Sequence, residues 1–240
     1  MKATERPDVA ASYIQRIREL VTGVRIMPEV NYGERDNAVV HLSDVTLGSC
    51  LAIPYYRMKA LKDGLKEPEI SDESCLFFLR GRAVERVVAN ELAPKTCEGI
   101  LFTVDDFHPA FGYGEVKSTA SDMSRFKPET MYDHWASRIK GYCHALGIQS
   151  FNLIVIFMIG NTASHKWAKP GRVTVALRAW NLEFAPEEIS ANWQFVLANK
   201  KELEGAVSGD HPLDPLMVTP KDYECKGCSW AASCQYTSSK

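Results

Sequence analysis

Two short segments in the middle of the chain carry the residue types that bind a hard metal ion. The stretch ILFTVDD contains Asp105, and the stretch GEVKST that follows contains Glu115 and Lys117. Oxygen ligands are those that Mg²⁺ prefers, and a bound divalent ion makes a water molecule nucleophilic at neutral pH. A neighbouring lysine can orient that water and offset the negative charge that develops on a phosphate. These residue types therefore suit hydrolysis of a phosphodiester.

The two segments are expected to form a β-hairpin that brings these side chains together. Runs 100–105 and 112–118 have strand composition and are separated by a turn with proline and glycine. Because strand side chains alternate, Glu115 and Lys117 should emerge on one face of the sheet. Val116 should then point into the core and leave its backbone carbonyl available as a further oxygen ligand.

The pattern leaves two alternatives open. A one-residue change of strand register would bring Asp106, in place of Asp105, to the face of the site. The spacing D-x9-E-x-K is also loose, so the same residues fit solvated charges at the ends of strands.

Four cysteines form a second candidate metal-binding set. Cys50 stands alone near the N-terminus, whereas Cys225, Cys228 and Cys234 form a C-x2-C-x5-C group. Thiolates suit zinc and iron-sulfur centres alike, so the four sulfurs do not identify the metal. The remaining cysteines lack partners at ligand spacing and are expected to be ordinary thiols: Cys75, Cys97 and Cys143.

The hydrophobic pattern predicts a mixed sheet flanked by helices, of the α/β or α+β class. Asp8 caps a first helix that Gly23 ends, Ser43 begins a short helix carrying Cys50, and a strong helix starts near Ser71. After the hairpin the pattern predicts a helix bounded by Pro128 and Gly147, a central strand over FNLIVIFMIG, a strand with one solvated face over GRVTVALRAWNLEF, and a last helix over 186–205.

Composition excludes several broad classes of protein. The 240 residues carry a formal net charge of -2, so no global basic field indicates a polyanionic partner, and any contact with nucleic acid must be local. The N-terminus has no apolar signal region and no apolar run is long enough to span a bilayer. The seven cysteines are an odd number, which favours reduced thiols or metal ligands over disulfides. We therefore expect a soluble, cytoplasmic protein.

Taken together, the segments resemble the PD-(D/E)XK nuclease superfamily. ILFTVDD and GEVKST are similar to its core, and the helix with Arg138-x3-Tyr142 is similar to the Gln-x3-Tyr motif of RecB-type nucleases and of the CRISPR-associated iron-sulfur exonucleases. LSDVTLGSCLAIPYYRMKA resembles the segment that donates the first cluster cysteine in those proteins. ECKGCSWAASC matches their C-terminal cysteine motif, so the resemblance runs from about residue 42 to 234.

The resemblance implies a restriction-endonuclease-like core that degrades DNA, commonly at single-stranded ends. Asp105, Glu115 and the Val116 carbonyl would hold Mg²⁺ or Mn²⁺, Lys117 would poise the water, and Tyr142 would occupy the family's tyrosine position. A [4Fe-4S] cluster, with Zn²⁺ as the alternative, would be held by Cys50, Cys225, Cys228 and Cys234. Implied settings are CRISPR spacer capture with its adaptation proteins, or phage and bacterial recombination and repair.

The sequence departs from the family pattern at two positions. Glu85 stands where the family often has a histidine; it is still an oxygen ligand, or else a solvent-facing helix charge. Arg138 replaces the glutamine of the tyrosine motif, and its guanidinium could grip a DNA phosphate. Tyr142 could also simply pack in the core. These substitutions keep open a non-catalytic DNA-binding or assembly subunit as the alternative function.

A basic and aromatic stretch provides a candidate DNA-binding loop. SHKWAKPGR lies between the two late strands, where Trp167 could stack on a base while Lys166 and Arg172 bind phosphates. A solvated hairpin tip is the alternative. The expected organisation is an N-terminal accessory helix and linker over 1–42, a first cluster-cysteine segment over 43–70, a nuclease core over 71–206 and a cysteine-rich tail over 207–240.

Overall fold

The computed structural model describes residues 1–21, 38–69, 88–89, 92–119, 123, 126–157, 176–218, 225 and 228–236. The helix predicted from Ser71, with Glu85, lies outside these residues. So does the predicted DNA-binding loop with Lys166, Trp167 and Arg172.

The described chain is built on a mixed five-stranded sheet in the order β1-β7-β6-β5-β4. Strands β5 and β6 run parallel, and the other neighbours run antiparallel. A separate antiparallel pair consists of β2 and β3. The strands are β1 (Lys2–Glu5), β2 (Lys95–Cys97), β3 (Ile100–Phe102), β4 (Asp106–His108), β5 (Gly112–Thr119), β6 (Ser150–Phe157) and β7 (Ala176–Glu183).

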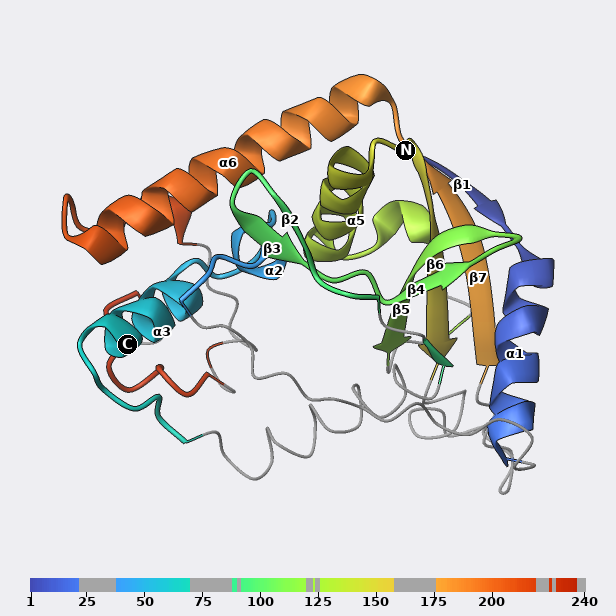
Figure 1. Ribbon diagram of the computed structural model, residues 1–240, viewed down its shortest axis with the longest axis horizontal. Coiled ribbons are helices and arrows are strands. Elements are labelled where there is room, and N and C mark those ends of the chain that lie inside the picture. Colours follow the sequence, from blue (N-terminus) through green and yellow to red (C-terminus); the bar gives the residue numbers. More distant parts are fainter. Residues whose placement is uncertain are drawn as a thin grey trace, which may run out of the picture.

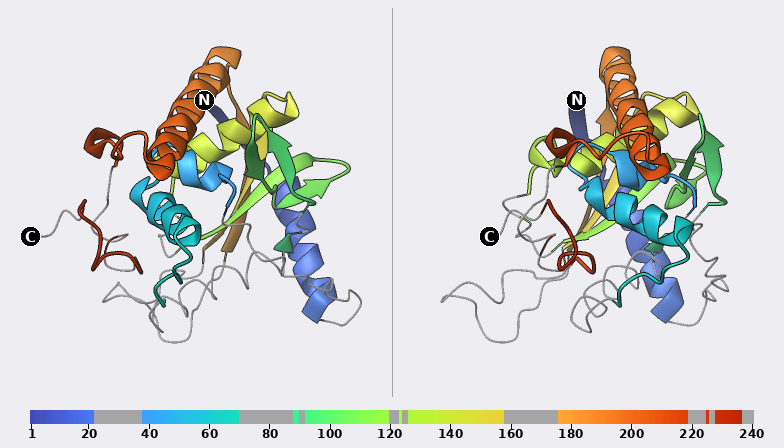
Figure 2. Two further views of the ribbon diagram at one scale, coloured as in Figure 1. Left: turned by 60° about the vertical axis from the view of Figure 1, so that its left-hand side comes forward. Right: turned by 90° about the vertical axis from the view of Figure 1, so that its left-hand side faces the viewer.

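Helices lie on both sides of this sheet, which confirms the predicted fold class (Figure 1). The α-helices are α1 (Pro7–Val21), α2 (Leu42–Val45), α3 (Ala52–Lys62), α5 (Asp133–Leu146) and α6 (Pro186–Ser208), and the 3-10 helices are η1 (Pro128–Thr130) and η2 (Pro215–Met217). Helix α6 packs along α5 and extends past it to α2 and α3 (Figures 1 and 2). None of the described helices is both long and apolar enough to cross a membrane.

The central strand β6 is buried on both faces, as its continuous apolar sequence predicts. Leu153 and Val155 face the core beneath α5 and α6, whereas Ile154 and Ile156 face a second core beneath α1. Each fully buried aliphatic side chain of this kind contributes roughly 1.5–3 kcal/mol to stability. The hydrophobic burial of β6 therefore fixes the plane on which the neighbouring β5 is displayed.

The N-terminal residues belong to this sheet. β1 pairs antiparallel with β7, and α1 packs Val9, Ala10 and Tyr13 against the face that carries Val116. The sequence pattern predicted the helix but not the edge strand before it, and the helix begins at Pro7, so Asp8 lies in its first turn and is not its cap. β1 is too short and polar to produce a hydrophobic alternation, so only its pairing with β7 defines it.

The predicted hairpin is wrong in its first strand. β3 ends at Phe102 and pairs with β2, and the strand that pairs with β5 is a separate three-residue strand, β4. The cause is the turn at Glu98 and Gly99, whose φ angles are 48° and 74°. This left-handed turn folds β3 back on β2, so the chain must leave that pair before it reaches β5. Asp105 consequently lies in a bend between β3 and β4.

The predicted helix carrying Cys50 is also wrong. α2 ends at Val45, and Cys50 lies in the turn that precedes α3. Gly48 has a φ of 80°, a left-handed conformation that interrupts a helix. The Ser49 hydroxyl donates to the Ser43 carbonyl at 3.0 Å and holds the turn in place.

We expect Gly141→Ala to destabilise the protein although alanine is the better helix former. A Cβ at Gly141 would lie 2.8 Å from Leu42 Cδ1, and Leu42 is fully buried. Overpacking of this kind costs about 1–3 kcal/mol, to be measured by urea unfolding. Gly205→Ala in α6 is the matched control, because its Cβ meets only the exposed, movable His211 ring. Equal stability changes in the two variants would contradict the close approach of α2 to α5.

Candidate active site

Strand β5 places Glu115 and Lys117 on the face that α5 covers. Glu115 pairs in register with Leu153 and Lys117 with Val155, so both side chains enter the same buried layer. Glu115 is completely buried, and Lys117 is 8% exposed. The Lys117 Nζ atom lies 2.6 Å from Glu115 Oε1 and donates to the Val116 carbonyl at 3.0 Å. The alternation predicted from the sequence therefore brings these groups together.

Asp105 reaches the same place from the bend before β4. β4 pairs with β5 only as far as Gly114, and just past that point the Val116 amide donates to Asp105 Oδ2 at 2.9 Å. The N–H and C=O of one strand residue point to the same edge, so the Val116 carbonyl lies on the edge that Asp105 approaches. Lys117 Nζ is 3.6 Å from Asp105 Oδ2.

The neighbouring Asp106 points to the opposite side of the sheet. Its carboxylate accepts hydrogen bonds from the Tyr13 hydroxyl and, at 2.6 Å, from Arg16 Nη1, both on α1. Asp106 is fully buried, whereas the Asp105 side chain is 23% exposed. The structure therefore groups Asp105, and not the alternative Asp106, with Glu115. Tyr13 and Arg16 were missed by the sequence reasoning, because no local pattern links α1 to β4.

Helix α5 closes the site from above the sheet. Arg138 and Tyr142 are four residues apart and so occupy one face of α5. Arg138 Nη1 lies 3.4 Å from Glu115 Oε1, which turns the expected phosphate-binding side chain inward. Tyr142 is buried and its hydroxyl donates to the Thr103 carbonyl at 3.0 Å, two residues before Asp105. Tyr142 thereby anchors the segment that carries Asp105.

Charge determines the ionisation of this buried group of side chains. Burial raises the pKa of the Glu115 carboxyl, but Lys117 and Arg138 more than offset this, and the pKa is lowered overall. Burial, together with the charge on Glu115, raises the pKa of Tyr142 well above its usual value. At neutral pH the site therefore contains an ionised glutamate and a protonated tyrosine.

One carboxylate oxygen fits a bound cation. Glu115 Oε2 is buried and has no hydrogen-bond partner among the described residues. A buried acceptor without a donor costs about 1–3 kcal/mol or more when it is charged, unless a cation contacts it. Glu115 Oε2, the Asp105 carboxylate and the Val116 carbonyl are hard oxygen donors grouped around Lys117, and that donor set suits Mg²⁺ or Mn²⁺.

The C-terminal cysteines lie near one another. Burial raises the pKa of the Cys228 thiol, and the charges of Cys234 and Cys225 raise it further. A metal ion bound at these cysteines would favour their thiolate forms.

The segment bearing these cysteines packs on α3, whose N-terminal end follows Cys50. Trp230 stacks on Tyr56 of α3 with ring centroids 5.8 Å apart, and the Gln235 amide donates to the Tyr56 hydroxyl at 3.2 Å. Cys50 and Cys234 border the same hydrophobic core. The segments that carry the four thiols, far apart in sequence, are thus adjacent in the fold (Figure 1).

A further group of metal-ligating residues escaped the sequence reasoning. Cys97, expected to be an ordinary thiol, and His144 of α5 lie close to Glu98 at the turn between β2 and β3. Cys97 and His144 belong to different elements far apart in sequence, so no ligand spacing could indicate the group.

No family model matches the sequence, and no curated protein matches it. Among solved structures, the chain is similar to SSO0001 with a TM-score of 0.42 and 12% identity, over 93% of this chain and 94% of that one. It is similar to the alkaline exonuclease LHK-Exo of Laribacter hongkongensis with a TM-score of 0.45 and 14% identity, over 72% and 91% of the two chains. It is also similar to a phage-related exonuclease from Haemophilus somnus 129PT, with a TM-score of 0.40 and 10% identity, over 72% and 96%. At these scores the geometry of the site, and not the likeness, carries the functional conclusion.

We expect Glu115→Gln to weaken the acid dependence of stability. Because the pKa of Glu115 is lowered in the fold, its ionised form stabilises the native state. That stabilisation is complete above the pKa of an unfolded glutamate, about 4.3, and is lost as the pH falls through the folded value. Urea unfolding from about pH 6 to pH 3, with a chelator present, should show a shallower decline for the variant than for the wild type.

The control for this measurement is Glu204→Gln. Glu204 is an exposed partner of Lys200 in a surface pair one helical turn apart, which contributes little to stability. A Glu115→Gln profile parallel to that of the wild type would show that Glu115 is not ionised in the fold.

Proposed function

We propose that the protein is a metal-dependent nuclease that hydrolyses DNA phosphodiester bonds. The observation that carries this proposal is the buried, unpartnered Oε2 of Glu115 beside Lys117 and within the same side-chain group as Asp105. Phosphodiester hydrolysis requires negative carboxylates that bind a metal ion and a positive group that offsets charge on the phosphate. Two carboxylates with a lysine held against them provide both.

Asp105, Glu115 and the Val116 carbonyl would hold Mg²⁺ or Mn²⁺. A divalent ion in this position supplies positive charge to a phosphate oxygen and lowers the pKa of a bound water. In this proposal the substrate approaches from the side of Asp105, the partly exposed member of the group. Glu85 completes this ligand set in our proposal; it lies outside the described residues.

Lys117 would orient the attacking water and offset charge on the phosphate. Its ammonium carries three N–H donors, and the described contacts direct it to Glu115, Asp105 and the Val116 carbonyl. The backbone contact holds Nζ at the site independently of either carboxylate. Tyr142 acts as a positioning residue, since its hydroxyl contacts the backbone of Thr103.

For the substrate we propose single-stranded DNA ends, in spacer capture, recombination or repair. This rests on the resemblance of the sequence motifs to the RecB-like and CRISPR-associated nucleases. Lys166, Trp167 and Arg172 would contact the strand; they lie outside the described residues.

We further propose that Cys50, Cys225, Cys228 and Cys234 hold a [4Fe-4S] cluster. The C-x2-C-x5-C spacing supports a shared centre, and the packing of Trp230 on Tyr56 brings this segment to α3. A bound cluster supplies four metal–thiolate bonds that tie the two ends of the chain, so binding free energy becomes folding free energy. Zinc is the alternative occupant of the same thiols.

One feature favours a non-catalytic DNA-binding or assembly subunit as the second candidate. Lys117 and Arg138 together carry two positive charges, which balance the two negative charges of Asp105 and Glu115. This balance lowers the electrostatic attraction of the site for a divalent ion. A protein that has lost catalysis could keep this arrangement as a structural ion-pair group.

Activity measurements on adjacent aspartates distinguish these functions. With labelled single-stranded DNA and Mn²⁺, we expect Asp105→Asn and Lys117→Ala to reduce cleavage by roughly 100- to 1,000-fold, as for loss of one preorganised electrostatic group. Asp106→Asn should retain cleavage per folded molecule. It should lower the unfolding free energy by about 3–5 kcal/mol, because Arg16 loses the buried carboxylate with which it pairs.

The outcomes of this experiment separate the candidates. Equal degradation by wild type and Lys117→Ala would identify a contaminating nuclease and overturn the proposal. Binding of the labelled DNA without cleavage by the wild type would favour the non-catalytic subunit.

The colour of the protein tests the cluster. Anaerobically purified protein should be brown, with a broad visible absorption that Cys228→Ser abolishes. Cys143→Ala is the control and should keep the colour, because Cys143 is a buried core thiol of α5 outside the four-cysteine set. A colourless protein with stoichiometric zinc would contradict the iron-sulfur assignment while leaving the hydrolytic one intact.

A further inference from the structure

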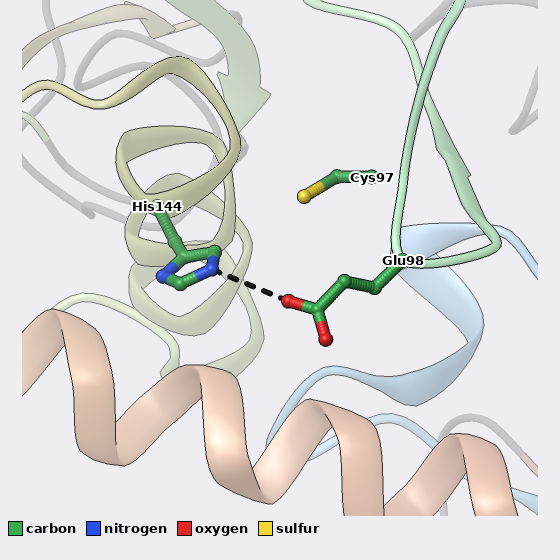
Figure 3. A group of neighbouring side chains, drawn as sticks. All are labelled: Cys97, Glu98 and His144. Atoms are coloured by element: carbon green, nitrogen blue, oxygen red, sulfur yellow. Dashed lines mark ion pairs between the residues drawn. The ribbon is translucent and has the colours of Figure 1, made fainter.

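Three side chains with different donor atoms converge at the turn between β2 and β3. The Cys97 thiol, the Glu98 carboxylate and the His144 imidazole place their ligand atoms within 4.8 Å of one another. Figure 3 shows Glu98 of the turn and His144 of α5 directed toward each other, with the Cys97 sulfur beside them. The group shares no residue with the candidate active site or with the four-cysteine set.

The orientation of two of these side chains is fixed by Trp193 of α6. The His144 ring stacks on Trp193 with centroids 4.4 Å apart and an angle of 14° between the planes. The Trp193 indole N–H donates to Glu98 Oε1 at 2.7 Å, and that oxygen is 3.6 Å from His144 Nε2. Preorganised donors of this kind lose little freedom when an ion binds.

The backbone at Glu98 gives a second reason to regard the carboxylate as functional. Its φ of 48° makes it the non-glycine residue with positive φ among the described residues. A left-handed conformation is unfavourable for a residue with a long side chain, and glycine or asparagine would suit this turn better. Local backbone strain is tolerated at such a position where the side chain has a role.

Two simpler explanations account for less of the geometry. A surface ion pair between His144 and Glu98 does not require the cysteine. An isolated, half-buried thiol does not require Glu98 and His144 beside it. Lys200, which approaches the turn at Gly99, is bound to Glu204 at 3.0 Å and so does not take the place of a cation at Glu98.

We propose that Cys97, Glu98 and His144 form a separate structural site for a borderline transition-metal ion, with Zn²⁺ as the ion that fits best. One sulfur, one nitrogen and one carboxylate oxygen are ligands that zinc accepts, and a water completes four-coordination. In zinc sites the ligand atoms lie roughly 3–4 Å apart, given metal–ligand distances of about 2.0–2.3 Å. The ligand atoms of this group lie within 4.8 Å of one another, so a bound ion would draw them slightly closer together.

Such an ion would fasten the β2–β3 turn to α5. β3 continues into Thr103, whose carbonyl is held by Tyr142 on the same helix. The ion and the tyrosine would thus hold the chain before Asp105 at two points on α5. This site is independent of whether the protein cleaves DNA.

Metal binding to the full chain tests the proposal. Zn²⁺ stoichiometry is measured by equilibrium dialysis on wild type and on Cys97→Ser and His144→Asn, all with the other cysteines intact. His211→Asn is the matched control, because His211 Nδ1 is also 3.6 Å from a glutamate, Glu202, but is not part of the Cys97 group. Loss of a residue that hydrogen-bonds to a metal ligand lowers metal affinity roughly 10- to 100-fold. Loss of a ligand itself should lower the Zn²⁺ affinity by at least as much.

A second measurement requires no substitution. Alkylation of Cys97 in the wild type is measured by mass spectrometry of the modified peptide. Zn²⁺ should slow this alkylation, and Mg²⁺ should not. We expect one Zn²⁺ equivalent fewer in the Cys97→Ser and His144→Asn variants and none fewer in His211→Asn. Unchanged stoichiometry in the two site variants, or equal alkylation of Cys97 with and without Zn²⁺, would overturn the proposal.

Discussion

The burial of the ionised Glu115 carboxylate is the constraint on which the rest of the site depends. A charged group removed from water must be paired, because its uncompensated burial costs several kcal/mol. Lys117 and Arg138 supply the pairing from the same strand and from α5. Two cations on one carboxylate oxygen keep the other oxygen, Oε2, buried but unpartnered among the described residues. The fold therefore keeps a charged oxygen, Glu115 Oε2, without a hydrogen-bond partner among the described residues. The partly exposed carboxylate of Asp105 belongs to the same group of side chains.

The sequence predicted the part of this site that depends on strand periodicity. Alternation along β5 is a local property, so the order of residues alone places Glu115 and Lys117 on one face and Val116 on the other. The choice between Asp105 and Asp106 was not predictable in this way. It depends on where β4 begins, and that is determined by the left-handed turn at Glu98 and by hydrogen bonds from α1 to Asp106.

Features that join distant elements were beyond sequence reasoning for the same reason. The pattern of α5 places Arg138 and Tyr142 on one helical face, but it does not indicate that the face covers Glu115 instead of DNA. The packing of the C-terminal cysteine segment on α3 rests on ring stacking between Tyr56 and Trp230, which no spacing predicts. In contrast, β6 was predicted as a central strand because burial on both faces leaves a continuous apolar run in the sequence.

Helix α5 contacts each of the segments that carry the proposed metal ligands. Arg138 contacts Glu115 and Tyr142 contacts Thr103, while His144 at the C-terminal turn of α5 faces the β2–β3 turn. The helix is itself held against α6 and against Leu42 at Gly141. The chain from β2 to β4 is short and bends at Asp105, and these contacts with α5 add to the backbone hydrogen bonds that hold it, such as that from the Leu101 amide to the Val40 carbonyl at 2.9 Å. A displacement of α5 would therefore move Asp105 and uncover Glu115 together, so that packing of this one helix controls both carboxylates of the proposed metal site.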